Sequence, residues 1–566
     1  MNHAAPPPLL SPVRGRRGAT RRRLLLIVTA MLALAFGLTS ALPAHAASYA
    51  RISGEGSSWA GAAWTDWVSQ AANQGVTVDY TPNGSSVGRD DFARQTNAVF
   101  ADSEIPFSGD ASDPQDKTTP AFKYGLLPVV AGGTAFMYNL PVGGNRFENL
   151  KLSMADVAGI FSGKITNWDS PELKASNPGV ALPNHQIVVV VRSDGSGATA
   201  QFKLWMLRQF PADYAYLTAH TGGSATSASS YFPTGSLSNF VAQNGSNGVT
   251  IYTSQNQYTI DYDEYSYAQA AGFPVAQVEN AAGYYTIPTA SAVAVALTQA
   301  IIDTNVNDPN YLSQNLSKVY TYKDPRTYTM SLYSYEIMPK QTNAITTNAK
   351  GATLAWLNTN AVCEWQREMG SLGYSPLPMN LVLASLDQVL QTPGIDAATR
   401  SKIAATQKGT LDGGTNPCNN PTFKPGDSPS HNVLVDTAPF PAGCNSACQA
   451  PWITASAATN VSSPTFTGSA VKGTAKTTAQ VKAPTAKGVA TSAATAAAQA
   501  CDPTTSTCSS AQGAADVVNA VPTVLGGQSG WAGPQTLALV LGALTAAILL
   551  APPLVSRALR RRGGRR

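Results

Sequence analysis

The sequence predicts an α/β fold for the central part of this chain of 566 residues. Strand-like and helix-like segments alternate through that part, and turns rich in Gly and Ser precede several of the expected helices. Apolar residues make up 43% of the chain and charged residues only 13%, which argues against wholesale disorder. The length is sufficient to bury a large core, so we expect a folded head over residues 47–400.

Four segments carry the alternation most clearly. Residues 59–72 predict an amphipathic helix, and residues 75–80 predict the short strand that follows it. Residues 186–191, β-branched from the second residue on, predict a buried strand that leads into a helix over residues 198–207. The inward faces of the two helices are expected to carry Trp64, Trp67, Val68, Phe202, Trp205 and Met206. No internal repeat is evident in the sequence of the head.

The N-terminus, residues 1–46, reads as a secretory signal peptide. Three arginines at residues 21–23 precede an apolar stretch over residues 24–38. Ala44-His45-Ala46 then supplies the small residues that a signal peptidase accepts, so the mature chain is expected to begin at Ala47. An uncleaved anchor is the alternative reading. The twin-arginine and the general export routes both stay open.

The C-terminal part predicts a tether to the cell membrane. Residues 456–530 are rich in Ala, Thr, Ser, Val and Lys and predict a disordered low-complexity linker. Residues 537–555 are 19 residues without a charge, close to the length of a transmembrane helix. Residues 556–566 hold six Arg, which predicts a cytoplasmic basic tail. The head is therefore expected outside the cytoplasm, anchored by one C-terminal span.

The net charge of +5 comes from the two ends of the chain. Residues 1–46 and residues 556–566 each hold six of the 38 basic residues and no acid, so 26 basic residues face 33 acidic ones between them. A nucleic-acid-binding body needs basic residues gathered on one face. A nucleic-acid partner is therefore not expected.

All six cysteines fall in the predicted exported part, where an oxidising environment favours disulfides. We expect local pairs Cys444–Cys448 and Cys501–Cys508, with Cys363–Cys418 as the remaining bond. A zinc site at Cys444 and Cys448, with His431 nearby, is the rival, although the spacing does not favour it. We expect no metal, and we separate residues 401–455 as a Cys-containing extension.

Three turns rich in Gly and Ser point to an anion as the ligand. They span residues 54–59, 84–88 and 194–199, and each comes at an expected helix start. The free N–H groups at a helix N-terminus and the positive end of the helix dipole favour a negative group. Arg192, which precedes the third turn, adds a cation with a planar donor fork. Any single turn of this kind is also explained as an ordinary helix cap.

Residues 190–197 resemble the R-x-D-G-S-G-T signature of the phosphate-binding component of phosphate ABC importers. Other segments that resemble this family are residues 131–141, 163–168, 177–179 and 373–378. The resemblance spans residues 49–400 and implies a two-lobed type 2 periplasmic-binding-protein fold. The first lobe would contain about residues 49–135 and 290–400, and the second about residues 136–289. Hinge closure would then bring donors of both lobes around the anion.

The same resemblance implies nine ligand-site positions. They are Ser58, the backbone of Trp59, Ser85, Glu104, Arg192, Asp194 as a brace for the Arg, Ser196, Gly197 and Ala198. Two positions depart from the family, because Ala198 replaces a Thr and Glu104 replaces an Asp. Thr199 and Asp102 are the neighbouring alternatives for the missing hydroxyl and for the acceptor. The alternative interpretation is that Glu104 is an ordinary solvated acid in a loop.

The acceptor matters for the choice of ligand. A carboxylate only accepts hydrogen bonds, so Glu104 would bond a protonated phosphate and repel fully ionised sulfate. Inorganic phosphate or a similar oxyanion is thus the expected ligand, with an ABC-importer permease as a partner and no cofactor.

Two other functions are weighed against binding and transport. A serine hydrolase would use Ser196 or Ser85 as its nucleophile, and only His185, His220 and His431 remain as bases after removal of the leader. Neither Ser85 nor Ser196 stands at the centre of a G-x-S-x-G turn, so we expect no enzyme. A cell-surface adhesion protein that keeps the fold but transports nothing is the second alternative, because the head hangs from a C-terminal span.

Overall fold

The computed structural model describes residues 49–107 and 118–441. The predicted signal peptide, linker, C-terminal span and basic tail lie outside these ranges, as do Cys444, Cys448, Cys501 and Cys508. Within the described ranges, no helix combines the length and the apolar character needed to cross a membrane. The predicted alternation of strands and helices is confirmed for the head.

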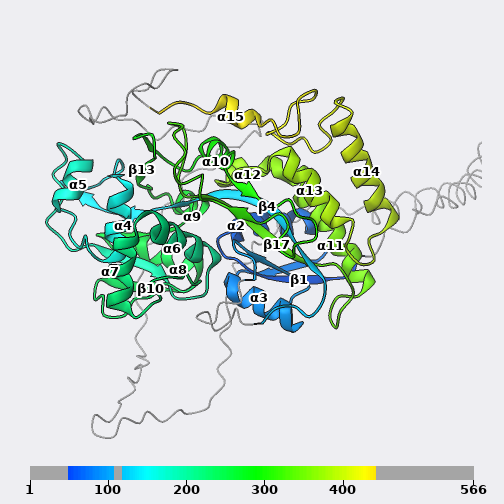
Figure 1. Cartoon of the computed structure of the whole chain (residues 1–566), viewed down its shortest axis with the longest axis horizontal. Coiled ribbons are helices and arrows are strands. Elements are labelled where there is room, and N and C mark those ends of the chain that lie inside the picture. The colour runs from blue at the N-terminus through cyan, green and yellow to red at the C-terminus, as the bar shows by residue number, and fades with distance from the viewer. Residues whose placement is uncertain (1–48, 108–117, 442–566) are drawn as a thin grey trace, which may run out of the picture. The chain divides into compact units, whose positions relative to one another are not determined.

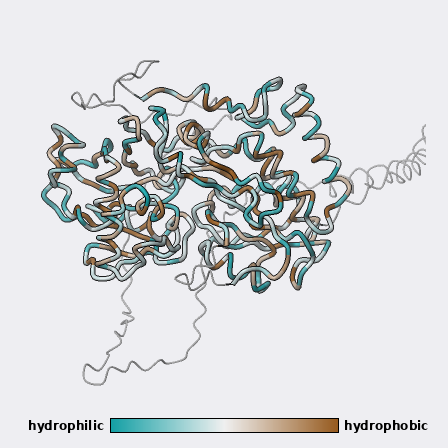
Figure 2. The backbone as a smooth tube through the Cα atoms, in the orientation of Figure 1, coloured by the Kyte–Doolittle hydropathy of each residue, from teal (hydrophilic) through white to brown (hydrophobic). Residues whose placement is uncertain are grey.

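Six strands form the first sheet, in the order β12-β4-β17-β3-β1-β2. β1 runs parallel to both β2 and β3, whereas β17 runs antiparallel to β3 and β4, and β12 antiparallel to β4. The strands are β1 (Ile52–Gly56), β2 (Val78–Thr81), β3 (Phe100–Ser103), β4 (Tyr124–Ala135), β12 (Asp263–Glu264) and β17 (Ser331–Pro339). β4 and β17 are buried along almost their whole length, and apolar stretches gather where they run (Figures 1 and 2).

Four strands form the second sheet, in the order β10-β9-β11-β5. β9 runs parallel to both β10 and β11, and β5 runs antiparallel to β11. The strands are β5 (Tyr138–Asn139), β9 (Val188–Arg192), β10 (Phe240–Gln243) and β11 (Thr259–Asp261). The second sheet therefore repeats the arrangement β2-β1-β3 of the first, with an antiparallel strand beside the third member in both.

A helix follows each of the first two strands of this repeated arrangement. In the first sheet α2 (Gly61–Asn73) follows β1 and α3 (Ser85–Arg94) follows β2. In the second sheet α6 (Gly197–Gln209) follows β9 and α8 (Gly245–Gln255) follows β10. The helices predicted over residues 59–72 and 198–207 are thus confirmed, with ends displaced by one or two residues. Trp64, Trp67, Phe202, Trp205 and Met206 are buried as expected, and Val68 is partly buried.

The remaining elements complete the described ranges. Small sheets are formed by β14-β13-β8, by β15 with β16, and by β6 with β7. Their strands are β6 (Pro141–Val142), β7 (Asn145–Arg146), β8 (Lys151–Leu152), β13 (Gln277–Glu279), β14 (Tyr285–Thr286), β15 (Ile301–Ile302) and β16 (Gln314–Asn315). The other helices are α4 (Met154–Ser162), α5 (Pro171–Ser176), α7 (Pro211–Thr221), α9 (Tyr265–Ala271), α10 (Ala290–Leu297), α11 (Asn348–Ala361), η1 (Glu364–Glu368), α12 (Met369–Leu372), α13 (Met379–Val389), α14 (Ala397–Leu411) and α15 (Val433–Thr437).

Aromatic side chains hold the first sheet to its helices. The ring of Trp64 on α2 lies 5.0 Å from that of Trp67, 4.8 Å from Tyr80 and 4.9 Å from Phe100. Offset or edge-on pairs at such distances stabilise a core beyond the area they bury. The dense Trp residues of this helix are therefore core residues, as the sequence predicts.

The disulfide predicted between Cys363 and Cys418 is confirmed. It joins the segment after α11 to the segment after α14, across a sequence separation of 55 residues. α14 continues through residue 400, and beyond it Asn420 donates from Nδ2 to the carbonyl of Leu377 at 2.9 Å. The described part of the extension, up to residue 441, is thus packed on the head rather than separate from it.

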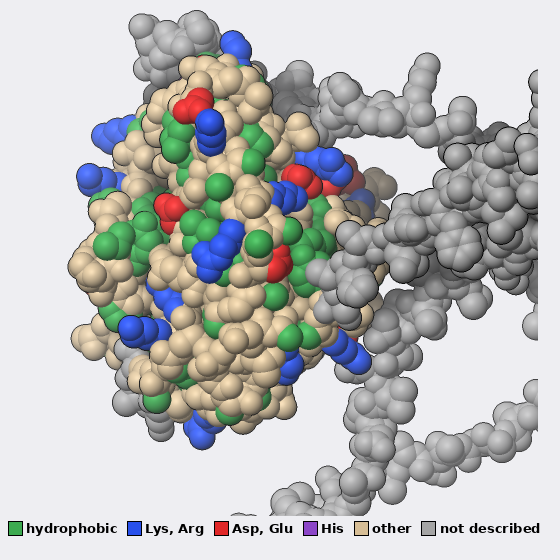
Figure 3. All heavy atoms as spheres, turned by 90° about the vertical axis from the view of Figure 1, so that its right-hand side faces the viewer, with side chains coloured by type: hydrophobic (Ala, Val, Ile, Leu, Met, Phe, Trp, Pro, Cys, Tyr) green, Lys and Arg blue, Asp and Glu red, His purple; other side chains and the backbone are tan. Residues whose placement is uncertain are grey.

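On the face drawn in Figure 3, Lys and Arg side chains lie scattered among neutral and acidic ones. This is the side on which α11 and α14 lie in Figure 1. No continuous basic surface is visible there, which agrees with a charge excess that resides at the two ends of the chain.

Candidate functional site

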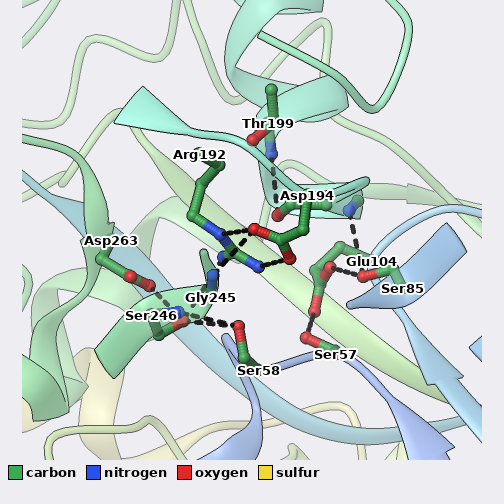
Figure 4. A network of polar contacts seen from close by, with 12 residues as sticks. Ser57, Ser58, Ser85, Glu104, Arg192, Asp194, Thr199, Gly245, Ser246 and Asp263 are labelled. Carbon is green, nitrogen blue, oxygen red and sulfur yellow. Dashed lines mark hydrogen bonds and ion pairs between the residues drawn. The ribbon is translucent and has the colours of Figure 1, made fainter. Parts of the chain in front are cut away.

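The candidate site lies at the carboxyl ends of the parallel strands of both sheets. The loops after β1, β2 and β3 bring Ser57 with Ser58, Ser85 and Glu104 to it. The loops after β9, β10 and β11 bring residues 192–199, Ser246 and Asp263. Ligands of open α/β sheets bind at these ends because loops and helix N-termini converge there. Figure 4 shows the resulting network of polar side chains.

Arg192 and Asp194 form the buried ion pair at the centre of this network. Arg192 donates from Nε to Asp194 Oδ1 at 2.8 Å and from Nη2 to Oδ2, with side-chain exposures of only 2% and 6%. The backbone N–H of Gly245 donates to the same Oδ1 at 2.8 Å. Burial alone would raise the pKa of Asp194, but the adjacent guanidinium holds it below its usual range. The site thus contains a fixed cation braced by an ionised carboxylate.

Two helix N-termini meet beside this pair. Ser196 caps α6 by accepting from the backbone N–H of Thr199 at 3.3 Å. The backbone N–H of Gly197, the first residue of α6, donates to the hydroxyl of Ser85 at 3.0 Å. Ser85 is itself the first residue of α3. A Cβ added at Gly197 would lie 2.6 Å from Glu104 Oε2, so only Gly lets this carboxylate approach the helix end.

Glu104 is fully buried and accepts three side-chain hydrogen bonds. Its Oε1 accepts from the hydroxyls of Ser57 and, at 3.0 Å, Ser334. Its Oε2 accepts from the hydroxyl of Ser85 at 3.0 Å. The reading of Glu104 as a solvated loop acid is therefore wrong. Asp102, the alternative acceptor, lies two residues before it on β3.

A second chain of hydrogen bonds joins the two sheets. The hydroxyls of Ser58 and Ser246 lie 2.8 Å apart, and the N–H of Ser246 donates to Ser58 Oγ at 3.0 Å. Ser246 Oγ donates in turn to Asp263 Oδ1 at 2.9 Å. Burial raises the pKa of Asp263 to about 6, although the charge of Arg192 opposes that shift. Loops that belong to different sheets are thus bonded directly across the site.

The structure brings most of the predicted site residues together. Ser58, Ser85, Glu104, Arg192, Asp194, Ser196 and Gly197 all belong to the network described above. Trp59 is buried beside Gly132, and its carbonyl accepts from the Tyr374 hydroxyl at 2.7 Å. Ala198 lies buried in the first turn of α6 with no polar side-chain atom to offer. The Thr199 hydroxyl, the neighbouring alternative, lies 2.6 Å from the Tyr262 hydroxyl.

Sequence reasoning missed Ser57, Gly245, Ser246 and Asp263. A signal for three of them was present. Ser57 lies in the predicted turn over residues 54–59, and Asn244-Gly245-Ser246 directly follows the strand β10 and begins α8. This is a fourth Gly/Ser turn at a helix start. Asp263 carried no such signal, because its place depends on which strand of the second sheet lies beside β9.

The described residues show where the candidate metal ligand His431 and the candidate bases lie. They contain no group of three or more His, Cys, Asp or Glu side chains arranged to hold a metal ion. His431 lies between Asp427 and Asp436, at 2.9 and 2.8 Å. The Nδ1 atoms of His185 and His220 lie 3.0 and 2.8 Å from the carbonyls of Gln186 and Tyr216, respectively. The three candidate bases are thus engaged elsewhere than at Ser85 or Ser196.

Comparison with known proteins agrees with this geometry. The family profile described as the PBP superfamily domain matches residues 41–360, more than half of the chain. The fold and the site therefore define a member of the PBP superfamily. Phosphate-binding protein PstS 3 of Mycobacterium tuberculosis is 30% identical over 315 residues, which cover 55% of this chain and 78% of the relative. The chain belongs to the family of these PstS proteins, and the resemblance predicted from residues 190–197 is confirmed.

Other matches extend this comparison. Phosphate-binding protein PstS of Pasteurella multocida is 32% identical over 252 residues, which cover 44% of this chain and 66% of the relative. Among solved structures, the periplasmic phosphate-binding protein PfluDING bound with phosphate matches with a TM-score of 0.45 at 20% identity. That match covers 59% of this chain and 92% of PfluDING.

Proposed function

We propose that this protein binds inorganic phosphate outside the cytoplasm and delivers it to a phosphate ABC importer. The single observation that carries the proposal is the buried Arg192–Asp194 pair beside the N-termini of α3 and α6. Helix ends, hydroxyls and one guanidinium are donors that suit a compact tetrahedral anion. The phosphate-binding relatives support the same ligand.

The ligand set proposed here comes from both sheets. In the first lobe, the set contains Ser58, Trp59, Ser85 and Glu104. In the second lobe, it contains Arg192, Asp194, Ser196, Gly197 and Ala198. Donors of the two lobes would replace the hydration shell of the anion as the hinge closes. Glu104 would accept the hydrogen bond of a protonated oxygen and so disfavour sulfate. The lobe boundaries near residues 135, 290 and 400 are part of this proposal.

The way in which the head is held at the cell surface is a further part of the proposal. Residues 1–46 would direct export, residues 456–530 would serve as a tether, and residues 537–555 would anchor the chain, with the tail 556–566 in the cytoplasm. A tethered receptor remains close to a permease in the same membrane, which raises the effective concentration of captured phosphate there. A pure adhesion role would need no such ligand site.

Titration calorimetry of the full chain in detergent tests the function. We expect phosphate to release heat with a 1:1 stoichiometry, and sulfate to release none at the same concentration. Arg192→Ala should weaken phosphate binding by at least about 100-fold, since charged hydrogen bonds contribute about 1.5 to 3 kcal/mol each. Arg326→Ala is the matched control, because it breaks another Arg–Asp pair, with Asp324, outside the site. Heat from no oxyanion would refute the proposed function.

A further inference from the structure

Behind Glu104 lies a second buried carboxylate, that of Asp102. Both side chains are fully buried, and both contact the same hydroxyl, that of Ser334 on β17. Ser334 Oγ lies 2.5 Å from Asp102 Oδ1 and 3.0 Å from Glu104 Oε1. The other oxygen of Asp102 accepts from Trp64 Nε1 at 2.9 Å. Two carboxylates are thus linked through one oxygen atom.

This linkage requires one proton more than Ser334 provides. A hydroxyl donates a single hydrogen bond, so it cannot satisfy both carboxylates at once. Two carboxylates that share a site do not both ionise readily, and one of them keeps a proton. The second hydrogen bond is made if that carboxyl donates to Ser334 Oγ while Ser334 donates to the other carboxylate.

The surroundings decide which carboxyl holds the proton. Glu104 also accepts from Ser57 on one oxygen and from Ser85 on the other, so its ionised form is well solvated by donors. Among the described residues, the side chain of Asp102 has one other donor, Trp64 Nε1. Burial first, and the charge of Glu104 second, raise the pKa of Asp102 well above its ordinary value. The proton therefore belongs on Asp102.

Three other ionisable groups lie around Asp102, and none of them changes the assignment of the proton to its carboxyl. Glu336 on β17 stands opposite Asp102 in the sheet register, and burial raises its pKa well above the ordinary value. Tyr80 on β2 has a pKa that burial, followed by the charge of Asp102, raises. Arg89 on α3 donates to the neighbouring Ser103 at 2.7 Å.

We propose that Asp102 and Ser334 form a proton-holding pair that keeps Glu104 a singly charged acceptor for the ligand. This inference rests on the proposed function. The order would be Asp102 O–H to Ser334 Oγ, and Ser334 O–H to Glu104 Oε1, with one negative charge on the three residues. An incoming oxyanion then meets one charge instead of two, and Glu104 accepts the hydrogen of a protonated oxygen. The preference for protonated oxyanions depends on three residues, with Asp102 and Ser334 as positioning residues.

Asp102→Asn tests the pair, because its amide N–H₂ donates to Ser334 as the protonated acid does, while nothing at position 102 titrates. Phosphate affinity of the full chain in detergent is measured by calorimetry from about pH 6 to about pH 10, beyond the ordinary range of a carboxyl. The wild type should lose at least about 10-fold in affinity at the alkaline end, as Asp102 loses its proton. Asp102→Asn should lack that alkaline loss, because no group at position 102 gives up a proton.

Glu336→Gln is the matched control, since it also replaces a buried acid of the same sheet, one whose carboxylate accepts from Asn358 Nδ2 at 2.8 Å. The Glu336→Gln variant should lose phosphate affinity at alkaline pH as the wild type does. Ser334→Ala breaks the link without touching either acid and should cost about 5- to 30-fold in phosphate affinity near neutral pH. Ser334→Ala also tests the proton-holding pair if the Asp102→Asn variant does not fold.

The outcomes separate the two levels of the proposal. An alkaline loss that persists in Asp102→Asn, or a Ser334→Ala variant that binds like the wild type, overturns the proton-holding pair and leaves phosphate binding intact. A wild type that binds no phosphate at any pH overturns the proposed function itself.

Discussion

At the scale of single residues, direct pairing with Arg192 decides in which direction the pKa of a buried carboxyl of the site moves. Asp194 and Asp263 lie within the same network and face the same guanidinium, yet their pKa values move in opposite directions. Asp194 makes two direct hydrogen bonds with Arg192, whereas Asp263 contacts it only through Ser246. A direct ion pair overcomes the cost of burying a charge, and a distant one does not.

Replacement of Asp263 by Asn should therefore change how stability depends on pH. The folded-state pKa of about 6 exceeds that of an unfolded Asp, about 3.9, so the folded chain holds the extra proton between these values. The stability that this proton contributes is present at acid pH and is lost as the pH rises toward about 6. We expect Asp263→Asn to gain about 1 to 3 kcal/mol relative to the wild type between about pH 4 and about pH 7.

Denaturant unfolding without phosphate at several pH values measures this difference. Glu148→Gln removes an acid whose side chain is 60% exposed and serves as the control with no comparable trend. A pH-independent difference between Asp263→Asn and the wild type would show that Asp263 is not the group that titrates.

At the scale of elements, the start of α6 is shaped by one close approach. Gly197 is the first residue of this helix, and Glu104 reaches its N-terminus from β3 of the other sheet. The added Cβ of an Ala would lie 2.6 Å from Glu104 Oε2 and 2.8 Å from the Glu104 backbone N. Contacts this short force the carboxylate or the helix to move.

Gly197→Ala should consequently weaken phosphate binding by at least about 10-fold and destabilise the fold by about 1 to 3 kcal/mol. Gly370→Ala is the matched control, because Gly370 also lies in a helix, α12, and a Cβ there meets nothing within 4 Å. It should be neutral or stabilising by up to about 1 kcal/mol. Calorimetry and thermal unfolding of both variants check this, and equal phosphate affinities in the two would contradict the close approach.

At the scale of the whole head, the two sheets contribute to the site in the same way. In each, the first two parallel strands lead to helix N-termini that carry hydroxyls or glycines, and the third leads to a carboxylate, Glu104 or Asp263. The direct bonds between Ser58 and Ser246 then hold the two sets together. We infer that these bonds stabilise the closed arrangement around the ligand.

Ser246→Ala should accordingly raise the phosphate dissociation rate by about 5- to 30-fold, since it removes hydroxyl hydrogen bonds across the site. The association rate should change little, because the encounter precedes closure. Stopped-flow kinetics measure both rates. Ser254→Ala, on the same helix α8 but bonded only to its own turn at Ile251, is the control. An unchanged dissociation rate in Ser246→Ala would assign these bonds no role in closure.

Local sequence patterns located most of the site. Residues 190–197 combine a β-branched strand, an Arg and a Gly/Ser turn, and both their local structure and their family assignment were predictable from these letters. The Gly/Ser turns at residues 54–59 and 84–88 were equally readable. Each of these turns is formed by residues that are neighbours in the chain. Local effects such as helix capping and the conformational freedom of glycine are therefore sufficient to identify it.

What the sequence by itself determined is the α/β class, the family and the Gly/Ser turn that follows Arg192. Only the tertiary structure decided that Ser246 and Asp263 join this site. It also decided that Ser334, about 230 residues further along the chain, links Asp102 to Glu104. Strand pairing sets these partnerships, because β17 lies beside β3 and β11 beside β9. Such pairing reflects the packing of the whole core, and no local pattern of residues specifies it.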